Sequence, residues 1–471
     1  MRSSTRAQLA VVPLAFAQLP AVPAAGEVPA ATLVGPIPEN VPPGDPSHDY
    51  IYFTPVEDLA DFGYMEEEYF VEGTANRYNT PALQTGSVAS SGHPYRTRIA
   101  VRRPISKRKA NGIILFEWQN VSAGYELDAH WGPSWPHLVE HGYTWVGVSA
   151  QRVGVHGSPI PFLAGRGLRQ WSPLRYGTLD VTAGGTVLDD SLSYDIFAQA
   201  AQAVLNPGGG FDPLGGIATK EAFAIGASQS AGRLTIYHNS IHPLHQLFDG
   251  LYLLVGGGPL RTDLDVKVLR YLSETDVLRA GPGIRQDDTD VLRTYEVAGT
   301  GHSSLVSDIY RTPLVTRDFG EVVLPATCDL PPFSAVPGYY VINKQYDLLT
   351  RWVRFGLTPP TAPQMEFDDA VPPQLVRDEF GIVVGGIRLP AVDAPVALNS
   401  GINSGSSPFC VLYGTNQPFD AALLQELYPN HFSYVQAVNQ SAFDALLSGF
   451  VTLRAYIEML LEAVFADVPP Q

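Results

Sequence analysis

The stretch Phe223-Ala-Ile-Gly-Ala-Ser-Gln-Ser-Ala-Gly-Arg233 decides the fold of this chain. The apolar residues at its start are typical of a buried strand, and the mixed residues 234–245 that follow are typical of a helix. Between them, Ser228 has the small residues Gly226 and Ser230 two positions away on each side. Small neighbours let the chain pass through a sharp strand–turn–helix elbow, which exposes the serine as a nucleophile.

The G-x-S-x-G motif can be aligned with this stretch in two ways. The common pattern is G-x-S-x-G, and Gly226-Ala-Ser-Gln-Ser230 departs from it at the last position, where serine is still small. The alternative frame, Ser228-Gln-Ser-Ala-Gly232, makes Ser230 the nucleophile. We prefer Ser228 because the strand-like run ends just before it. The N–H of Gln229, at the start of the helix, is then aimed at the place where an oxyanion would form.

A serine hydroxyl needs a base that accepts its proton. His302 lies in Ala298-Gly-Thr-Gly-His-Ser303, on a loop directly after a strand-like run, and this kind of sheet carries its base at such a position. His431, in a helix-like segment near the C-terminus, is the weaker alternative. We therefore expect His302 to be the base.

The acid that orients the histidine should follow the preceding strand of the sheet. The segment Ser273-Glu-Thr-Asp276 comes directly after the strand-like residues 266–272. Asp276 is preferred because the loop carries it beyond the strand end, and Glu274 is the competing candidate. Either carboxylate would hold the imidazole in the right tautomer and stabilise the imidazolium.

The second donor to an oxyanion should come from the loop after an early buried strand. The apolar residues 112–118 form such a strand, and Asn120-Val-Ser122 follows it. A backbone N–H near Val121 is the candidate donor. Asn120 is the alternative member of this site, because its side chain can hydrogen-bond within the loop and hold it in place.

No metal ion or organic cofactor is expected. His238-x-x-x-His242 has the spacing of two metal ligands on a helix, but it lacks a neighbouring glutamate and is followed at once by Pro243. The glycines 256–258 follow a strand but lack a phosphate-loop lysine, so they are interpreted as a turn.

Composition and charge limit the class of protein. The 471 residues suffice for one large α/β domain with extensions or for two domains. The formal net charge is −17, and basic runs are confined to Arg102-Arg103 and Lys107-Arg-Lys109. This balance argues against binding to nucleic acid or to anionic membrane surfaces.

The start of the chain has the features of an export signal. Residues 1–26 combine a positively charged beginning, an apolar run over 7–17 and small residues around a cleavage site. The alternative is a disordered tail rich in Ala and Pro. No other stretch is apolar enough to span a bilayer, so we expect an exported protein without a membrane span. After export, Cys328 and Cys410 could form one disulfide, which the sequence leaves open.

Strand-like runs alternate with helix-like segments through the middle of the chain, for example at residues 112–118, 143–149 and 250–255. This alternation predicts the α/β class, with a mainly parallel central sheet and helices on both faces. The Gly- and Pro-rich residues 152–190 predict a long surface excursion. The expected parts are a signal or tail (1–26), an N-terminal extension with strands (27–97), the α/β core (98–310) and a mostly helical C-terminal layer packed on the core (311–471).

The motifs together resemble the α/β-hydrolase superfamily, and more narrowly a poorly characterised family described as the alpha/beta hydrolase domain family. The resemblance covers most of residues 60–460 and implies an α/β-hydrolase fold and ester hydrolysis through an acyl-enzyme, but no particular substrate. Ser230 stands where the superfamily usually has the closing glycine of the elbow. The stretches that carry the resemblance are Glu66-Glu-Glu-Tyr-Phe-Val-Glu-Gly-Thr-Ala-Asn76, Glu117-Trp-Gln-Asn-Val-Ser122, Tyr194-Asp-Ile-Phe197, Gly226-Ala-Ser-Gln-Ser230, Glu274-Thr-Asp276, Ala298-Gly-Thr-Gly-His302, Arg351-Trp-Val-Arg-Phe-Gly356 and Leu427-Tyr-Pro-Asn-His431.

The resulting hypothesis is a serine hydrolase that cleaves small-molecule carboxylic esters with Ser228, His302 and Asp276. Lactone opening, amide hydrolysis and acyl transfer on the same residues are alternatives, as is a binding protein that keeps the fold without catalysis. Aromatic residues in segments that could border the site favour an apolar or aromatic substrate group. They are Tyr125, Trp131, Trp135, Trp171 and Tyr176.

Overall fold

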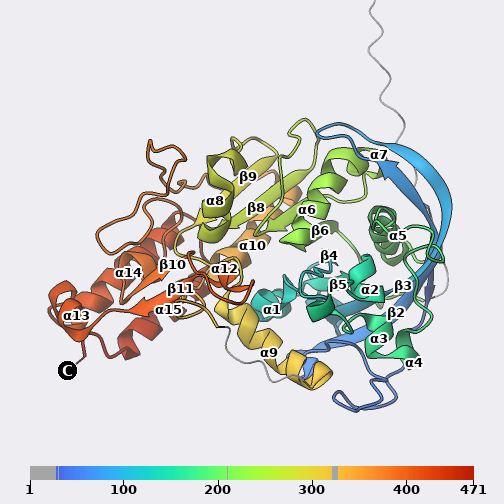
Figure 1. Cartoon of the computed structure of the whole chain (residues 1–471), viewed down its shortest axis with the longest axis horizontal. Coiled ribbons are helices and arrows are strands. Elements are labelled where there is room, and N and C mark those ends of the chain that lie inside the picture. Colours follow the sequence, from blue (N-terminus) through green and yellow to red (C-terminus); the bar gives the residue numbers. More distant parts are fainter. Residues whose placement is uncertain (1–27, 30, 209–210, 321–326, 471) are drawn as a thin grey trace, which may run out of the picture.

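The computed structural model describes residues 28–29, 31–208, 211–320 and 327–470. The expected export signal, residues 1–26, lies outside these described residues. Figure 1 shows a large central sheet, with the long strands β2 and β3 at its right and a lobe of C-terminal helices at its left. The described helices include none that combines the length and the apolar character needed to cross a membrane.

The described residues form one nine-stranded sheet in the order β1-β2-β3-β5-β4-β6-β7-β8-β9. The neighbours from β5 to β9 along this order are parallel, and β1, β2 and β3 are antiparallel additions at one edge. This arrangement confirms the predicted α/β class. The strands are β1 (Thr32–Val34), β2 (Tyr64–Asn79), β3 (Ser87–Pro104), β4 (Ile113–Trp118), β5 (Thr144–Val148), β6 (Glu221–Ala227), β7 (Gly250–Leu254), β8 (Lys267–Ser273) and β9 (Leu292–Val297).

Helices follow most of the parallel strands, because parallel neighbours need a crossover connection. They are α1 (Trp131–Glu140), α2 (Arg152–His156), α3 (Leu168–Trp171), α4 (Pro173–Tyr176), α5 (Ser193–Leu205), α6 (Gln229–Ile236), α7 (His242–His245), α8 (Glu274–Ala280) and α9 (Leu305–Phe319). The C-terminal part adds α10 (Tyr339–Phe355), α11 (Pro390–Asp393), α12 (Cys410–Tyr413), α13 (Ala421–Leu427), α14 (His431–Leu447) and α15 (Leu453–Phe465), with a small sheet of β10 (Ala397–Ser400) and β11 (Thr415–Pro418).

Strand β4 is buried along its whole length because helices cover both faces of the sheet. Successive side chains of a strand point to opposite faces. The Trp118 ring stacks on Phe197 of α5, with the two ring centroids 4.5 Å apart. The Glu117 carboxylate points to the other face, where it meets the first residues of α1. The alternation along this one strand therefore places α5 and α1 on opposite sides of the sheet.

Glu117 fixes the start of α1. Its carboxyl oxygens accept hydrogen bonds from the backbone N–H groups of His130 (2.9 Å) and Trp131 (3.3 Å) and from the indole N–H of Trp145 (2.7 Å). Burial raises the pKa of this carboxyl to about 8, although the three N–H donors lower it. A buried acid thus replaces an exposed cap at the N-terminus of this helix.

The segment 152–190 is not the surface excursion that its glycines and prolines predict. It forms α2, α3 and α4, and the side chains of Trp171 and Tyr176 are buried. The Tyr176 hydroxyl donates a hydrogen bond of 2.7 Å to Glu68 of β2, and the Trp171 indole N–H donates one of 2.8 Å to the Asp318 carbonyl of α9. Contacts with distant elements give this segment its structure, and local composition does not reveal them.

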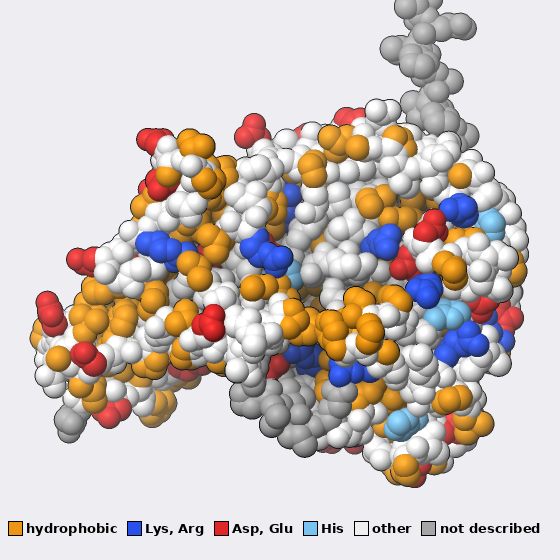
Figure 2. Space-filling model, in the orientation of Figure 1, with side chains coloured by type: hydrophobic (Ala, Val, Ile, Leu, Met, Phe, Trp, Pro, Cys, Tyr) orange, Lys and Arg blue, Asp and Glu red, His pale blue; other side chains and the backbone are white. Residues whose placement is uncertain are grey.

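The C-terminal helices expose several large apolar side chains. Figure 2 shows hydrophobic side chains gathered over the region of α13 to α15. The exposed apolar residues of α14 and α15 are Phe432, Phe443, Leu447, Leu453, Ile457, Leu461, Val464 and Phe465.

The expected boundary at residue 310 lies inside α9, so this helix is shared by the expected core and the C-terminal layer.

The raised pKa of Glu117 predicts a pH dependence of stability. In the folded state the carboxyl holds its proton up to about pH 8, whereas in the unfolded chain it loses the proton near its ordinary value of about 4.5. The folded protein therefore binds more protons in this window, and its stability falls as pH rises through it, by up to about 1.4 kcal/mol per pH unit. Glu117→Gln should remove this slope.

The measurement is the free energy of unfolding in urea at several pH values between about 5 and 8. Glu140→Gln, the same change at the exposed end of α1, is the control and should follow the wild type. Parallel curves for the wild type and Glu117→Gln would contradict the proposed titration.

Candidate active site

Ser228 forms the turn between β6 and α6, where the strand–turn–helix pattern predicts an elbow. Its backbone has a positive φ of 55°, which is strained for a residue other than glycine. A Cβ atom on Gly226 would lie 3.0 Å from the carbonyl oxygen of Ser230, and one on Gly256 would lie 3.0 Å from that of Ser228. Glycine at both positions therefore leaves room for the elbow. The role of Gly256 was not foreseen from the sequence, where it reads as an ordinary turn.

His302 lies on the loop between β9 and α9, and it faces the elbow. Its Nε2 atom is 2.8 Å from Ser228 Oγ, and its Nδ1 atom is 2.7 Å from Asp276 Oδ1. The structure thus brings together three side chains that lie 74 and 26 residues apart in sequence. Each follows a different parallel strand, and the carboxyl ends of these strands meet at one edge of the sheet.

Asp276 is held by the first turn of α8. Its Oδ2 atom accepts hydrogen bonds from the Ser273 hydroxyl at 2.6 Å and from the Ser273 N–H at 3.0 Å. Burial raises the pKa of the Asp276 carboxyl, but the adjacent His302 ring and the bonds from Ser273 outweigh burial and leave the pKa below its ordinary value. Asp276 is therefore ionised beside the imidazole at neutral pH.

Glu274 does not reach His302. One of its oxygens accepts hydrogen bonds from Arg377 at 2.7 Å and from the Ser400 hydroxyl at 3.0 Å, and the other accepts one from the Gly299 N–H at 2.9 Å. The side chain is fully buried. It ties the loop that carries His302 to the C-terminal part of the chain.

The loop after β4 lies against the elbow. The Asn120 side chain donates a hydrogen bond of 2.8 Å to the carbonyl of Ala227, and its own oxygen accepts one of 2.9 Å from the Ser122 N–H. Asn120 therefore holds this loop beside the turn at Ser228, and Val121 in the same loop is buried. Gln229 is the first residue of α6, where backbone N–H groups have no partner within the helix.

A cavity of about 420 Å³ opens over Ser228 and His302. Of the aromatic residues expected to border the site, Tyr125 lines this cavity, whereas Trp131, Trp135, Trp171 and Tyr176 are not among its lining residues. Trp131 packs against Trp145 in the core instead. Sequence reasoning missed most of the aromatic lining, which includes Tyr271, Tyr310, Tyr339, Phe409 and Tyr413.

The alternative serine and histidine lie elsewhere. The Ser230 hydroxyl is buried in the first turn of α6, where it donates a hydrogen bond of 2.8 Å to the Ala227 carbonyl. The two ring nitrogens of His431 lie 3.0 Å and 3.2 Å from the carbonyl oxygens of Val468 and Val464, near the end of α15. Neither side chain takes part in the contacts of Ser228 with His302.

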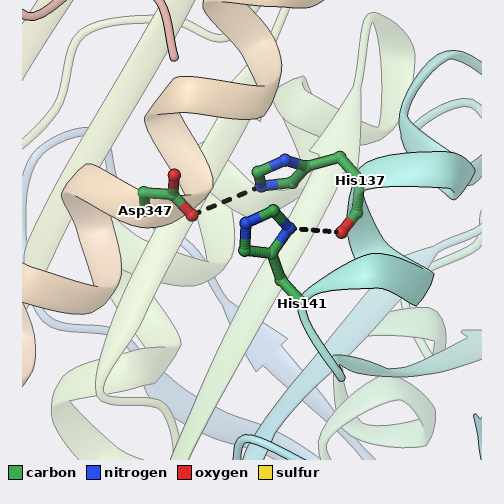
Figure 3. A group of neighbouring side chains, drawn as sticks. All are labelled: His137, His141 and Asp347. Atoms are coloured by element: carbon green, nitrogen blue, oxygen red, sulfur yellow. Dashed lines mark hydrogen bonds and ion pairs between the residues drawn. The ribbon is translucent and has the colours of Figure 1, made fainter. Parts of the chain in front are cut away.

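Among the described residues, one group of three side chains has the arrangement of metal ligands. It consists of His137, His141 and Asp347, which Figure 3 shows facing one another between α1 and α10. These residues do not line the cavity over Ser228. Within the described part of the chain, no third ligand joins His238 and His242 into such a group.

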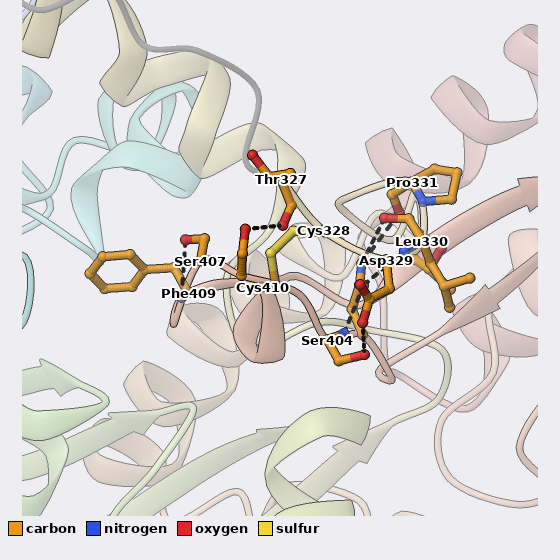
Figure 4. Close-up of a disulfide and its surroundings, with 12 residues drawn as sticks. Thr327, Cys328, Asp329, Leu330, Pro331, Ser404, Ser407, Phe409 and Cys410 are labelled. Atoms are coloured by element: carbon orange, nitrogen blue, oxygen red, sulfur yellow. Dashed lines mark hydrogen bonds between the residues drawn. A yellow bond between two sulfur atoms is a disulfide. The ribbon is translucent and has the colours of Figure 1, made fainter.

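The two cysteines form a disulfide that supports one wall of the cavity. Cys328 and Cys410 are bonded (Figure 4), and the residues next to Cys410 include Phe409, Leu412 and Tyr413 of the cavity lining. The Leu412 carbonyl also accepts a hydrogen bond of 2.8 Å from the N–H of Ser303, beside His302. Disulfides are typical of oxidising compartments, which agrees with the expected export.

The strand order and the sharp elbow after β6 define the class of α/β-hydrolase folds. A family model described as "Alpha/beta hydrolase domain" matches residues 33–460, nearly the whole chain. The protein therefore belongs to the alpha/beta hydrolase domain family, as the resemblance of its motifs implies.

Several solved structures are similar to part of this chain. The esterase Est22 is 14% identical, and the match covers 55% of this chain and 78% of Est22 with a TM-score of 0.30. A serine hydrolase without a lid from Xanthomonas campestris is 14% identical over 54% of this chain and 96% of its own, with a TM-score of 0.26. The dienelactone hydrolase-like phosphotriesterase P91 from metagenomic libraries is 13% identical over 48% and 81%, with a TM-score of 0.24. Such distant likenesses carry no information on substrate. No curated protein matches the chain.

The position of the disulfide predicts a local effect on the cavity wall. A double variant, Cys328→Ser with Cys410→Ser, should lose about 2–5 kcal/mol of stability, because the bond closes a loop of 82 residues. Amide hydrogen exchange should accelerate in residues 405–414. Exchange in β6, at the centre of the sheet, should stay slow and serves as the internal control. Unchanged exchange in residues 405–414 would show that the bond does not hold this wall.

Proposed function

We propose that this protein is a serine hydrolase that cleaves carboxylic esters through an acyl-enzyme. The observation that carries the proposal is the unbroken hydrogen-bond chain from Ser228 Oγ to His302 Nε2 (2.8 Å) and from His302 Nδ1 to Asp276 Oδ1 (2.7 Å). Ser228 and His302 line a cavity. Nucleophile, base and orienting acid in these contacts are what activation of a serine requires. A binding protein without catalysis would not need all three.

In the proposed acylation step, Ser228 Oγ bonds to the carbonyl carbon of the ester while His302 Nε2 takes the hydroxyl proton. Asp276, which stays ionised, stabilises the imidazolium that forms. The N–H groups of Gln229 and Val121 are the proposed donors to the negatively charged oxygen of the tetrahedral intermediate. His302 then gives the proton to the departing alkoxide, and the C–O bond to the alcohol breaks.

Deacylation repeats these steps with water as the nucleophile. His302 takes a proton from water as the water oxygen bonds to the acyl carbon, and then returns a proton to Ser228 Oγ as the acyl bond breaks. The products are a carboxylic acid and an alcohol, and the enzyme is regenerated. The proposed chemistry asks for no metal or organic cofactor.

The cavity favours an aromatic or apolar ester group. Tyr125, Tyr310, Tyr339 and Tyr413 line the cavity and offer aromatic surface to such a group, and Ile342 adds apolar surface. Tyrosine also presents a hydroxyl, so the lining suits an aryl group with polar substituents. A panel of aryl esters, alkyl esters, lactones and amides, offered with and without an acceptor alcohol, separates ester hydrolysis from the other reactions of the same residues.

The role of Ser228 is tested by substitution and by covalent labelling. Ser228→Ala should lower kcat by about 10³-fold or more, because only binding and oxyanion stabilisation would remain. A fluorophosphonate probe should label the wild type at Ser228 and leave Ser228→Ala unlabelled, as read by mass spectrometry. Ser230→Ala is the matched control. It removes a hydroxyl that donates to the Ala227 carbonyl and accepts from the Ala227 N–H. Since each hydrogen bond contributes on the order of 1 kcal/mol, kcat should fall by no more than about 30-fold.

An active Ser228→Ala together with an inactive Ser230→Ala would move the nucleophile to the second frame. A folded wild type that the probe does not label would favour the non-catalytic binding protein.

Substitution of Asp276 and of Glu274 should change different properties of the protein, kcat for the first and thermal stability for the second. Asp276→Asn should lower kcat by about 10⁴-fold while leaving the thermal midpoint nearly unchanged, because an amide favours the wrong histidine tautomer. Glu274→Gln should affect kcat far less and lower the thermal midpoint, because it weakens a buried ion pair with Arg377. Steady-state kinetics and thermal unfolding measure both. The opposite ranking of the two kcat values would give the orienting role to Glu274.

A further inference from the structure

A second group of functional side chains lies away from the cavity, between α1 and α10. His137 and His141 are one helical turn apart at the end of α1, and Asp347 extends from the middle of α10 (Figure 3). One ligand atom from each of the three lies within 4.8 Å of the others. The spacing of four residues puts both imidazoles on one side of the helix.

The orientation of His141 leaves its second nitrogen available. Its Nδ1 atom lies 3.0 Å from the His137 carbonyl oxygen, and a carbonyl only accepts, so Nδ1 carries the proton. Its Nε2 atom then carries the lone pair and points toward Asp347 (Figure 3). A backbone carbonyl that fixes the tautomer in this way is the usual outer support of a metal-bound histidine.

His137 contributes a buried nitrogen that lacks a hydrogen bond. Its Nε2 atom is 3.3 Å from Asp347 Oδ1, yet it has no hydrogen-bond partner of good geometry among the described residues. The side chain of His137 is 7% exposed. Leaving such a nitrogen without a partner costs on the order of 1–3 kcal/mol, so a bound ligand would remove a penalty.

We propose that these three side chains bind a Zn²⁺ ion, with His137 Nε2, His141 Nε2 and one Asp347 oxygen as protein ligands and water as the fourth. Zinc takes bonds of about 2.0–2.2 Å to such nitrogen and oxygen ligands, so two ligand atoms of a tetrahedral site lie roughly 3.3 Å apart. The His137–Asp347 separation already equals this value. The His141 ring stacks on His137 with centroids 4.1 Å apart, and in the proposed zinc-bound form this exposed side chain shifts to bring its Nε2 within bonding distance of the ion.

The place of the site in the fold assigns it a structural role. The N-terminal ends of both helices line the cavity, α1 through Gly132 and Pro133 and α10 through Tyr339 and Ile342. The ion would join the two helices farther along their lengths, outside the cavity. Zinc at this site therefore clamps two walls of the cavity to each other and takes no part in the chemistry of Ser228.

The test uses full-length protein without a histidine tag, stripped of metal with a chelator and titrated with ZnCl₂ by calorimetry. The wild type should bind one equivalent with micromolar or tighter affinity. His141→Ala and Asp347→Asn should weaken zinc binding by about 100-fold, a loss of affinity typical of substitutions at metal sites. His93→Ala removes a half-buried histidine of β3 outside the group and is the matched control.

Two further readouts bear on the same site. Co²⁺ in place of zinc should give the visible absorption of a tetrahedral ion in the wild type and in His93→Ala, but not in His141→Ala. Excess ZnCl₂ should raise the thermal midpoint of the wild type and not that of His141→Ala. The metal-free midpoints of these two proteins should agree, which shows that the variant folds.

Equal zinc affinity of the wild type and His141→Ala, or no zinc binding by the wild type, would overturn the proposal. Turnover of a small ester should be nearly the same with and without zinc at low temperature. A large loss of turnover on zinc removal would overturn the structural role. Because the affinity measurements do not use turnover, they are independent of the proposed esterase activity.

Discussion

The strained backbone of Ser228 is the constraint on which the rest of the site depends. A positive φ at a residue with a side chain costs on the order of 1–3 kcal/mol, and the surrounding structure must hold it. The Ser228 N–H donates a hydrogen bond of 2.8 Å to the Leu254 carbonyl at the end of β7, and Asn120 holds the preceding carbonyl of Ala227. Strand β6 is itself buried between β4 and β7. The centre of a parallel sheet can therefore sustain a turn that an exposed loop could not.

The N-terminal extension is joined to this sheet by buried charges. Arg98 of β3 makes ion pairs of 2.9 Å with both Glu68 of β2 and Glu126, and Glu68 also accepts hydrogen bonds from Tyr176 and Arg175. Buried charges are tolerated when they are paired and hydrogen-bonded in this way. Removing any one of these charged side chains would leave the buried network with an unbalanced charge, so the extension, the segment of α2 to α4 and the core hold one another in place.

Much of the fold could be predicted because its cues are local. The apolar runs that become β4, β5 and β8 are bounded by turn residues, and the amphipathic run of α10 ends at Gly356. The prediction of a surface excursion at residues 152–190 was wrong for a physical reason. Glycines and prolines indicate where the backbone can turn, but they do not indicate which side chains are buried. Trp171 is buried partly by His48, whose ring stacks on it with centroids 4.5 Å apart. A contact across more than a hundred residues leaves no periodic signal in either segment.

The sequence by itself determined the α/β class and the loops that carry Ser228, His302 and the acidic pair, because each follows a strand with a recognisable local pattern. Only the tertiary structure showed which of the two carboxylates contacts His302. Both lie in the first turn of α8, but Asp276 points toward His302 and Glu274 points toward Arg377. The tertiary structure also distinguished the two histidine pairs of equal spacing. His137 and His141 meet Asp347 from a helix some 200 residues later, whereas within the described residues His238 and His242 meet no third ligand. The spacing of two histidines along one helix can be read from the sequence. Whether a second helix brings a third ligand close to them depends on how the helices pack on the sheet.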